Sequence, residues 1–275
     1  MTRTLADAAI AVLTCADARA KAETSLDAAA AWRDGRIAEI GCAKPPDRPG
    51  RPETPELRLP RDMPKRRKAQ SLAGRTALLH ALAHIELNAI DLAWDAVARY
   101  ADPAAAGLDL PRGFFDDWVT VGAEEATHFS LLSDRLAALD SHYGALPAHD
   151  GLWQAAMDTS ENLAARLAVV PMVLEARGLD VTPAMIAALK KAGDPDSAAI
   201  LQRIHDDEIG HVAIGKRWFE HVCAAENQPP IETWQALVRR YFKGTLKRPF
   251  NTKSRDMAGF ASAFYEPLAD DPPGH

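Results

Sequence analysis

The sequence has few cysteines and no long apolar run, and each absence excludes a class of protein. Its three cysteines, Cys15, Cys42 and Cys223, are too few and too scattered for a disulfide framework or a cysteine-rich metal site. No run approaches the roughly 18 apolar residues that a membrane span requires. The first residues also lack the uninterrupted apolar core of an export signal. We therefore expect a soluble protein of the reducing cytoplasm, with no membrane partner.

A strong excess of charge of one sign is also absent. The formal net charge is −6 over 275 residues, and hydrophobic residues make up 47% of the chain, as in an ordinary globular protein. This charge gives no overall bias toward nucleic acids, so we rank a nucleic-acid partner low. The length allows one large domain or two small ones.

Apolar residues recur with a helical period, whereas Val, Ile and Thr form no alternating runs, so the fold class expected is all-α. One or two short helices are expected within 4–34. The later helices are expected near 70–101, 113–141, 150–178, 182–192, 194–226 and 230–243. Breaks are expected at residue 102, at residue 143 and in RGLDVTP from residue 177, and Pro171 should kink its helix. Four long amphipathic helices predict a four-helix bundle.

Seven prolines fall between residues 45 and 64 and exclude a regular helix or strand there. We therefore divide the chain into four parts. They are an N-terminal helical segment (1–44), a proline-rich strap (45–69), the four-helix bundle (70–226), and a C-terminal helix with a basic tail packed on the bundle (227–275).

Two short stretches, EEATHF (124–129) and DDEIGH (206–211), each place a His three residues after a Glu. The pairs are Glu125 with His128 and Glu208 with His211. Residues three apart share one face of a helix, and apolar side chains continue that face on both sides of each pair. A single Glu-x-x-His match is weak evidence, but two matches on core-facing stripes of long helices indicate a common purpose.

The other two long helices also place a carboxylate on an apolar stripe. These are Glu86 on the first and Glu175 on the third, with Glu161 left open as the alternative to Glu175. Glutamate is rarely buried unless it is paired or bound to a metal. Each long helix thus contributes one carboxylate, and two of them add an imidazole.

This combination predicts a site for two metal ions. Two divalent cations would neutralise four buried carboxylates, and oxygen-rich ligation with two imidazoles suits iron or manganese and leaves positions for dioxygen. The expected ligands are Glu86, Glu125, His128, Glu175, Glu208 and His211. His205 is a candidate for holding a ligand by a hydrogen bond, with an ordinary solvated histidine as the alternative. His80 and His84 are expected on a polar face and not among the ligands.

Several stretches together carry a resemblance to a known family. They are GRTALLHALAHIELNAIDLAWD (74–95), EEATHF, AHDGLWQAAM (148–157), LAVVPMVLEARGLDVTP (167–183), DDEIGHVAIGKRWF (206–219) and KRPFNTKSRDMAGF (247–260). Over nearly its whole length the chain resembles the ferritin-like superfamily, and within it an uncharacterised bacterial family catalogued as domain of unknown function 455. A more distant likeness is to the ferritin-like tRNA hydroxylases. The resemblance implies the ferritin-like fold and the metal site, and it supplies no reaction.

The leading hypothesis is a di-iron enzyme that uses dioxygen to oxidise or hydroxylate an unidentified substrate. Two iron ions are expected, with manganese or a mixed pair left open. Because the sequence shows no flavin or nicotinamide fingerprint, a separate reductase is expected as a partner. The alternatives are a ferroxidase or iron-handling protein, and a non-enzymatic nucleic-acid-binding or scaffold bundle with a structural metal.

Two segments concentrate basic residues. RDMPKRRK (61–68) holds five, and RRYFKGTLKRPFNTKSR (239–255) holds seven. The simpler interpretation is a solvated linker and tail. The functional one is a pair of flaps for an anionic substrate, with Arg248 and Arg255 as the binding candidates because a guanidinium pairs with two oxygens at once. If both arginines pair with acids of the bundle, the tail is a clasp instead.

Overall fold

The computed structural model describes residues 4–58, 62–63 and 70–269, and this part of the chain is all-helical. It contains no β-strand, and its β-type pairing consists of isolated bridges. Within the same ranges, no helix is both long and apolar enough to cross a membrane. Most of the basic segment 61–68 lies outside the described residues.

The chain divides into two compact units. Unit 1 comprises Met1–Trp153 with Ala187–Ile200, and unit 2 comprises Gln154–Ile186 with Leu201–His275. The helices predicted near 70–101, 113–141, 194–226 and 230–243 are confirmed to within about one turn.

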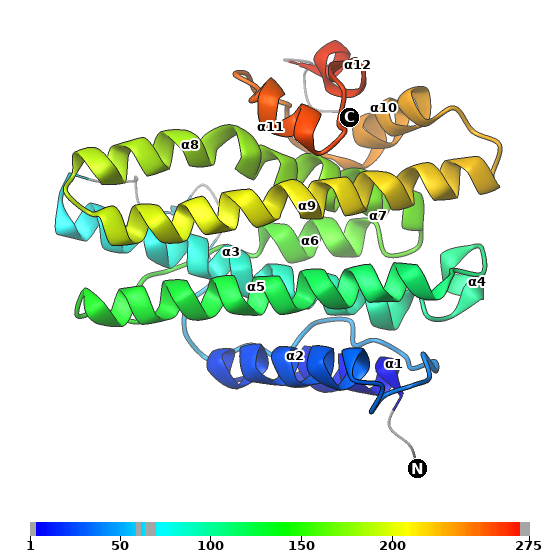
Figure 1. Ribbon diagram of the computed structural model, residues 1–275, viewed down its shortest axis with the longest axis horizontal. Coiled ribbons are helices and arrows are strands. Elements are labelled where there is room, and N and C mark those ends of the chain that lie inside the picture. The colour runs from blue at the N-terminus through cyan, green and yellow to red at the C-terminus, as the bar shows by residue number, and fades with distance from the viewer. Residues whose placement is uncertain (1–3, 59–61, 64–69, 270–275) are drawn as a thin grey trace. The chain divides into compact units, whose positions relative to one another are not determined.

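Unit 1 is built on two long helices that lie side by side, α3 and α5 (Figure 1). Its helices are α1 (Leu5–Thr14), α2 (Ala18–Arg33), α3 (Leu72–Arg99), α4 (Pro103–Ala106) and α5 (Arg112–Ala138). Helix α3 begins where the Ser71 side chain accepts a hydrogen bond from the backbone N–H of Gly74. Helices α1 and α2 pack against α3 and α5.

A close approach between α3 and α5 fixes their register. A Cβ atom on Gly122 of α5 would lie 2.7 Å from Nε1 of Trp94 on α3, so the indole fits only against glycine. Nε1 of Trp94 donates to Oγ of Ser25 on α2, and that hydroxyl donates to the Gly122 carbonyl, both at 2.7 Å. Glu86, eight residues before Trp94 on α3, contacts His128, which is six residues after Gly122 on α5. The two helices are therefore antiparallel.

Unit 2 contains a helix that changes type along its length. Helix α7 (Leu163–Val169) continues as the π-helical segment η2 (Val170–Glu175) and then as α8 (Ala176–Lys191). The π-helical turn includes Pro171, which lacks a backbone N–H, at the place where the sequence predicts a kink. The indole N–H of Trp234 donates to the carbonyl of Ala168 at 3.2 Å, so this irregular turn keeps a buried carbonyl satisfied.

The remaining elements of this part of the chain are α6 (Gly151–Asp158), α9 (Pro195–Ala225), α10 (Pro230–Tyr241), α11 (Thr252–Met257), α12 (Ser262–Tyr265) and the 3₁₀ turn η3 (Glu266–Leu268). Beyond residue 243 the basic tail forms three of these elements, α11, α12 and η3. Within unit 2, α10 packs against α7 and α12.

Two helix boundaries predicted between residues 150 and 192 are wrong. The predicted helix 150–178 is interrupted between α6 and α7, where Asn162 caps α7 by accepting from the N–H of Ala165 at 2.7 Å. The predicted break in RGLDVTP is absent, because α8 runs through Pro183. Proline leaves the Leu179 carbonyl without its helical partner, and the side-chain amide of Asn251 donates to that oxygen at 3.1 Å.

Candidate metal centre

Unit 1 brings three of the predicted ligands together in its interior. Glu86 lies on α3, and Glu125 and His128 lie one turn apart on α5, where their spacing of three puts them on one face. Their exposed fractions are 2%, 0% and 0%. One ligand atom from each residue lies within 4.8 Å of the other two. Nδ1 of His128 is 3.2 Å from Oε2 of Glu86 and 3.4 Å from Oε2 of Glu125.

Charge in this cluster is balanced by shared protons. Burial, together with the nearby carboxylate of Glu125, raises the pKa of Glu86 well above its usual value. Burial alone would lower the pKa of His128, because it disfavours the charged imidazolium form. Hydrogen bonds to Glu125 and Glu86 outweigh this effect and raise the pKa of His128 to about 11. A divalent cation would supply the same positive charge in place of protons. Two carboxylates and one imidazole therefore fit a transition-metal ion.

Unit 2 holds the second Glu-x-x-His pair on α9. Nδ1 of His211 is 3.6 Å from Oε2 of Glu208, and the exposed fractions of the two side chains are 1% and 12%. The pair again lies on one face because of its spacing. The local arrangement predicted from DDEIGH is thus present.

Glu175 and this pair lie on the same side of a close contact between η2 and α9, but the ligand atoms of Glu175, Glu208 and His211 do not all lie within 4.8 Å of one another. A Cβ atom on Gly215 would lie 2.3 Å from the ring of Pro171, so the two backbones meet closely at that point. Farther along both helices Pro183 and His205 line one cavity, which makes the segments antiparallel. Glu175 is four residues after Pro171, and His211 is four residues before Gly215. Both therefore lie one turn away from the contact on the same side.

The structure also bears on the choice between the two candidate glutamates of the third predicted helix. Glu161 is exposed and lies before α7 begins, whereas Glu175 is half-buried and is the last residue of η2. Segments of π-helix occur frequently at functional sites. Position and burial therefore favour Glu175.

Arg255 is held inside unit 2. It is 3% exposed, and its Nε and Nη2 donate to the two carboxylate oxygens of Asp180 on α8 at 2.9 and 2.8 Å. The rings of Phe250 and Tyr265 pack against its guanidinium, with centroids 4.9 and 4.4 Å away. Both oxygens of an internal carboxylate thus occupy the fork that was expected to bind substrate, so Arg255 ties α11 to α8.

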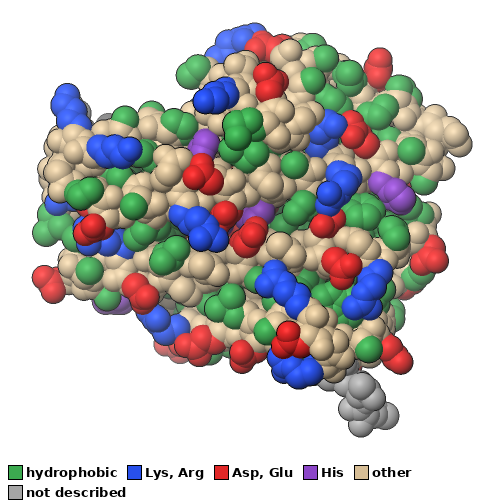
Figure 2. Space-filling view, in the orientation of Figure 1, with side chains coloured by type: hydrophobic (Ala, Val, Ile, Leu, Met, Phe, Trp, Pro, Cys, Tyr) green, Lys and Arg blue, Asp and Glu red, His purple; other side chains and the backbone are tan. Residues whose placement is uncertain are grey.

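Arg248 is half-exposed, and its Nη1 lies 2.5 Å from Glu266. On the face shown in Figure 2, basic and acidic side chains are interspersed and form no single basic patch. His205 is buried, with Nε2 3.3 Å from Oγ of Ser254, and it lines a cavity of unit 2. The structure therefore gives His205 a surrounding of its own in addition to its place one turn before Glu208.

His80 and His84 are buried, so their expected place on a polar face is wrong. Nε2 of His80 accepts from the N–H of Gly144 at 2.9 Å, and Nδ1 of His84 lies 2.8 Å from the hydroxyl of Tyr143. Burial lowers the pKa of each histidine to about 4. Both are therefore neutral hydrogen-bonding groups of the core.

A buried polar network along α3 has no counterpart in the sequence-based predictions. Asp91 is fully buried, contacts Nζ of Lys21 on α2, and lies 3.0 Å from Nη2 of Arg51 in the strap. Arg51 also donates to the side chain of Asn88 at 2.7 Å, and the Asn88 amide donates to the carbonyl of His84 at 2.7 Å. The sequence does contain a pattern that could have indicated this network. Polar residues recur at helical spacing on α3 and form a second stripe beside the apolar one.

One protein family and one protein of known sequence match this chain over most of its length. A family model for a protein of unknown function, DUF455, matches residues 14–266. A Haemophilus influenzae protein, described as an uncharacterized protein, is 41% identical over 209 residues, which cover 76% of this chain and 72% of that protein. No solved structure matches the chain. Because the family match includes both Glu-x-x-His pairs and nearly all of both units, the chain belongs to the DUF455 family.

Proposed function

We propose that the protein is a di-iron carboxylate protein of the ferritin-like superfamily and acts as an oxygen-dependent oxidase or hydroxylase. The observation that carries the proposal is the buried cluster of Glu86, Glu125 and His128 in unit 1. Two carboxylates closed off from solvent are costly in an apolar interior unless positive charge neutralises them. A divalent metal ion meets that requirement with the ligand types that are present.

The second set supports a second metal ion. Glu208 and His211 lie one turn apart on α9, and Glu175 lies on the same side of the contact between Pro171 and Gly215 as His211. This set has the composition of the first, two carboxylates and one imidazole. One Glu plus one Glu-x-x-His, present twice in the sequence, is the ligand pattern of di-metal four-helix bundles.

Iron(II) bound by these ligands would supply electrons for the reduction of dioxygen. The residues of the chain would neutralise the charge of the ions and keep water away. Val121 and Leu132, one turn before and after the Glu125–His128 pair on α5, are buried and close the interior around it. A separate reductase would return electrons, because the sequence shows no nucleotide-binding fingerprint of its own.

Metal analysis of protein purified without oxygen tests the proposal. We expect about two iron ions per chain in the wild type and the loss of most of the iron in His128→Ala or Glu208→Ala, because each change deletes a ligand and unbalances the charge. His221→Ala is the matched control, since His221 is exposed on the same helix as His211. Retention of both ions in Glu125→Ala/Glu208→Ala would contradict the site assignment.

Reaction with dioxygen tests the proposed activity separately from metal binding. The iron(II) protein is mixed with oxygenated buffer, and its absorption is followed by stopped flow. We expect rapid oxidation, because carboxylate-rich ligation leaves positions for dioxygen on the metal. Iron(II) that stays reduced in air for hours would favour a structural role for the metal. Uptake of many more than two irons per chain would favour iron storage.

A further inference from the structure

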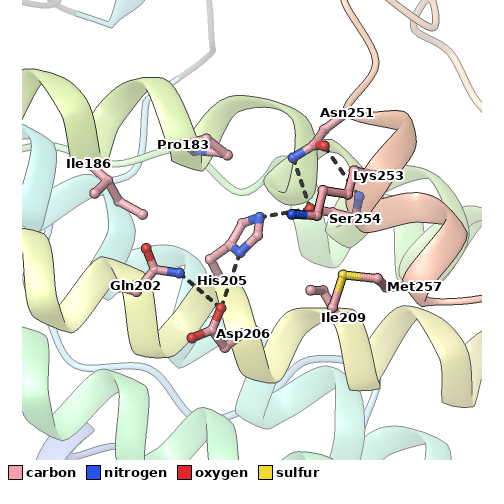
Figure 3. A pocket seen from close by; sticks show the side chains of 10 residues that line it. All are labelled: Pro183, Ile186, Gln202, His205, Asp206, Ile209, Asn251, Lys253, Ser254 and Met257. Carbon is pink, nitrogen blue, oxygen red and sulfur yellow. Dashed lines mark hydrogen bonds and ion pairs between the residues drawn. The ribbon is translucent and has the colours of Figure 1, made fainter.

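Unit 2 contains a cavity of about 380 Å³ that the proposed function does not use (Figure 3). Its volume lies in the range of small-molecule sites. The cavity lies between α8, α9 and α11, and its apolar lining comes from Pro183, Ile186, Ile209 and Met257. Met257 is 63% exposed, which leaves an apolar side chain open to solvent at this place.

The residues of α9 that line the cavity are centred on a different side of the helix from Glu208 and His211, and only His205 lies one turn from a predicted ligand. Gln202, His205, Asp206 and Ile209 line the cavity, and their spacing follows one stripe of the helix. Asp206 and Glu208 are two residues apart and therefore about 200° apart around the helix. The cavity can thus be tested without reference to the metal.

One wall of the cavity is fixed by internal hydrogen bonds of the NTKSR stretch. The Asn251 side chain accepts from the N–H of Ser254 at 3.2 Å and donates to Oγ of Ser254 at 2.9 Å and to the Leu179 carbonyl at 3.1 Å. Its backbone N–H donates to Asp180 at 2.9 Å. Asn251 and Ser254 are therefore engaged by the protein, and this wall is formed before any ligand arrives.

His205 has an unused hydrogen-bonding atom at the cavity. The residue is 8% exposed, and its Nε2 lies 3.3 Å from Oγ of Ser254. Among the described residues its buried Nδ1 has no hydrogen-bond partner, since Oδ1 of Asp206 is 3.6 Å away. Buried polar atoms normally have a partner. The tautomer that donates from Nε2 to Ser254 leaves Nδ1 as an acceptor.

Two solvent-exposed charged residues, Asp206 and Lys253, also line the cavity. Asp206 accepts from the neutral amide of Gln202 at 2.9 Å and pairs with no Lys or Arg among the described residues. Over the same ranges, Lys253 makes no ion pair. A purely anionic ligand would meet the Asp206 carboxylate, and a purely cationic one would meet the Lys253 ammonium. The complementary ligand carries both charges.

We propose that this cavity binds a small zwitterion, a free α-amino acid with an apolar side chain. Lys253 pairs with its carboxylate. Asp206 and Nδ1 of His205 accept hydrogen bonds from its ammonium group. The apolar side chain contacts Ile186 and Ile209.

Isothermal titration of the full chain with L-leucine tests this inference. Two analogues isolate the charges, since 4-methylpentanoate lacks the ammonium and 3-methylbutylamine lacks the carboxylate. We expect leucine to bind about tenfold or more tightly than either analogue, because each loses a charge-assisted contact. The titration is repeated after removal of metal with a chelator, and the same affinity is expected, so failure of the metal proposal leaves this result unaffected.

Two variants then assign each contact. Lys253→Gln should weaken leucine binding about tenfold but should not weaken 3-methylbutylamine, whereas Asp206→Asn should weaken leucine similarly but should not weaken 4-methylpentanoate, because each variant removes a charge that repels the analogue. Lys190→Gln is the matched control, an exposed lysine on α8 that does not line the cavity. The inference is overturned if leucine gives no heat at about 10 mM, a concentration at which even millimolar affinity would be detected. Equal binding of leucine and 4-methylpentanoate, or unchanged leucine affinity in Asp206→Asn/Lys253→Gln, also overturns it.

Discussion

Replacing Lys21 by methionine tests whether the buried ion pair between α2 and α3 stabilises unit 1. Lys21 is fully buried, and its Nζ contacts the carboxylate of Asp91 and lies 2.9 Å from the carbonyl oxygen of Gly50. Burial lowers the pKa of Lys21, and the charge of Asp91 opposes that shift. Methionine keeps most of the apolar volume but removes the charge. The buried Asp91 would then depend on Arg51, 3.0 Å away.

Removing one partner of a buried ion pair costs about 3–5 kcal/mol. Because Arg51 still neutralises part of the charge of Asp91, we expect a loss of about 3 kcal/mol in the free energy of unfolding. At roughly 2–4 °C per kcal/mol for a chain of this size, the thermal midpoint should fall by about 6–12 °C. Urea unfolding followed by circular dichroism measures the free energy, and a thermal scan measures the midpoint.

Arg19→Met is the matched control on the same helix. The guanidinium of Arg19 pairs with Asp134 at 2.7 Å, but the two side chains are 54% and 67% exposed. Such surface pairs contribute less than about 1 kcal/mol. An equal loss of stability in Lys21→Met and Arg19→Met would refute the reasoning. Lys21→Met/Asp91→Leu should be more stable than Lys21→Met, because it leaves no buried carboxylate, and the opposite order would also count against it.

Three further perturbations have defined outcomes. Gly215→Ala should cost about 1–3 kcal/mol in unfolding experiments, because its Cβ would meet the Pro171 ring at 2.3 Å, whereas Gly210→Ala has open space and should be neutral or stabilising. His80 and His84, each with its pKa lowered to about 4, stay neutral when folded, so each should contribute a decline in stability of about 3 kcal/mol as the pH falls from 6.5 toward 4, and His80→Gln should remove only its own share of that decline. Anaerobic iron(II) should raise the thermal midpoint of the wild type but raise it much less in Glu125→Ala, and equal shifts would contradict the ligand assignment.

The helices and the Glu125–His128 pair could be predicted because each depends on the spacing of residues along a single helix. Glu125 and His128 share a face at any helical position with a spacing of three, and apolar neighbours show which face is buried. Glu86 was recognisable because a carboxylate on an apolar stripe needs a partner. The structure brings these three residues together in unit 1. The metal itself and the reaction stay predictions.

The errors arise where a distant residue decides a local outcome. Pro183 is a helix breaker by local rules, but Asn251, 68 residues later, supplies the hydrogen bond that lets α8 continue. Arg255 was a candidate for binding substrate, with a clasp as the alternative, because no local pattern shows that Asp180 is its partner. The burial of His80 depends on the loop that donates to it from residue 144. Such pairings become visible only when the chain is folded.

The ion pair of Lys21 also bears on the order in which the chain can assemble during its synthesis. The counter-charge of Lys21 lies 70 residues further along the sequence, on α3. Chains emerge N-terminus first, so α1 and α2 are complete long before Asp91 exists. Until then the ammonium has no carboxylate to accompany it into the interior, and the N-terminal helices stay solvated. A nascent chain halted before residue 91 should therefore show rapid amide exchange throughout α1 and α2, and one that includes α3 and α5 should show protection there.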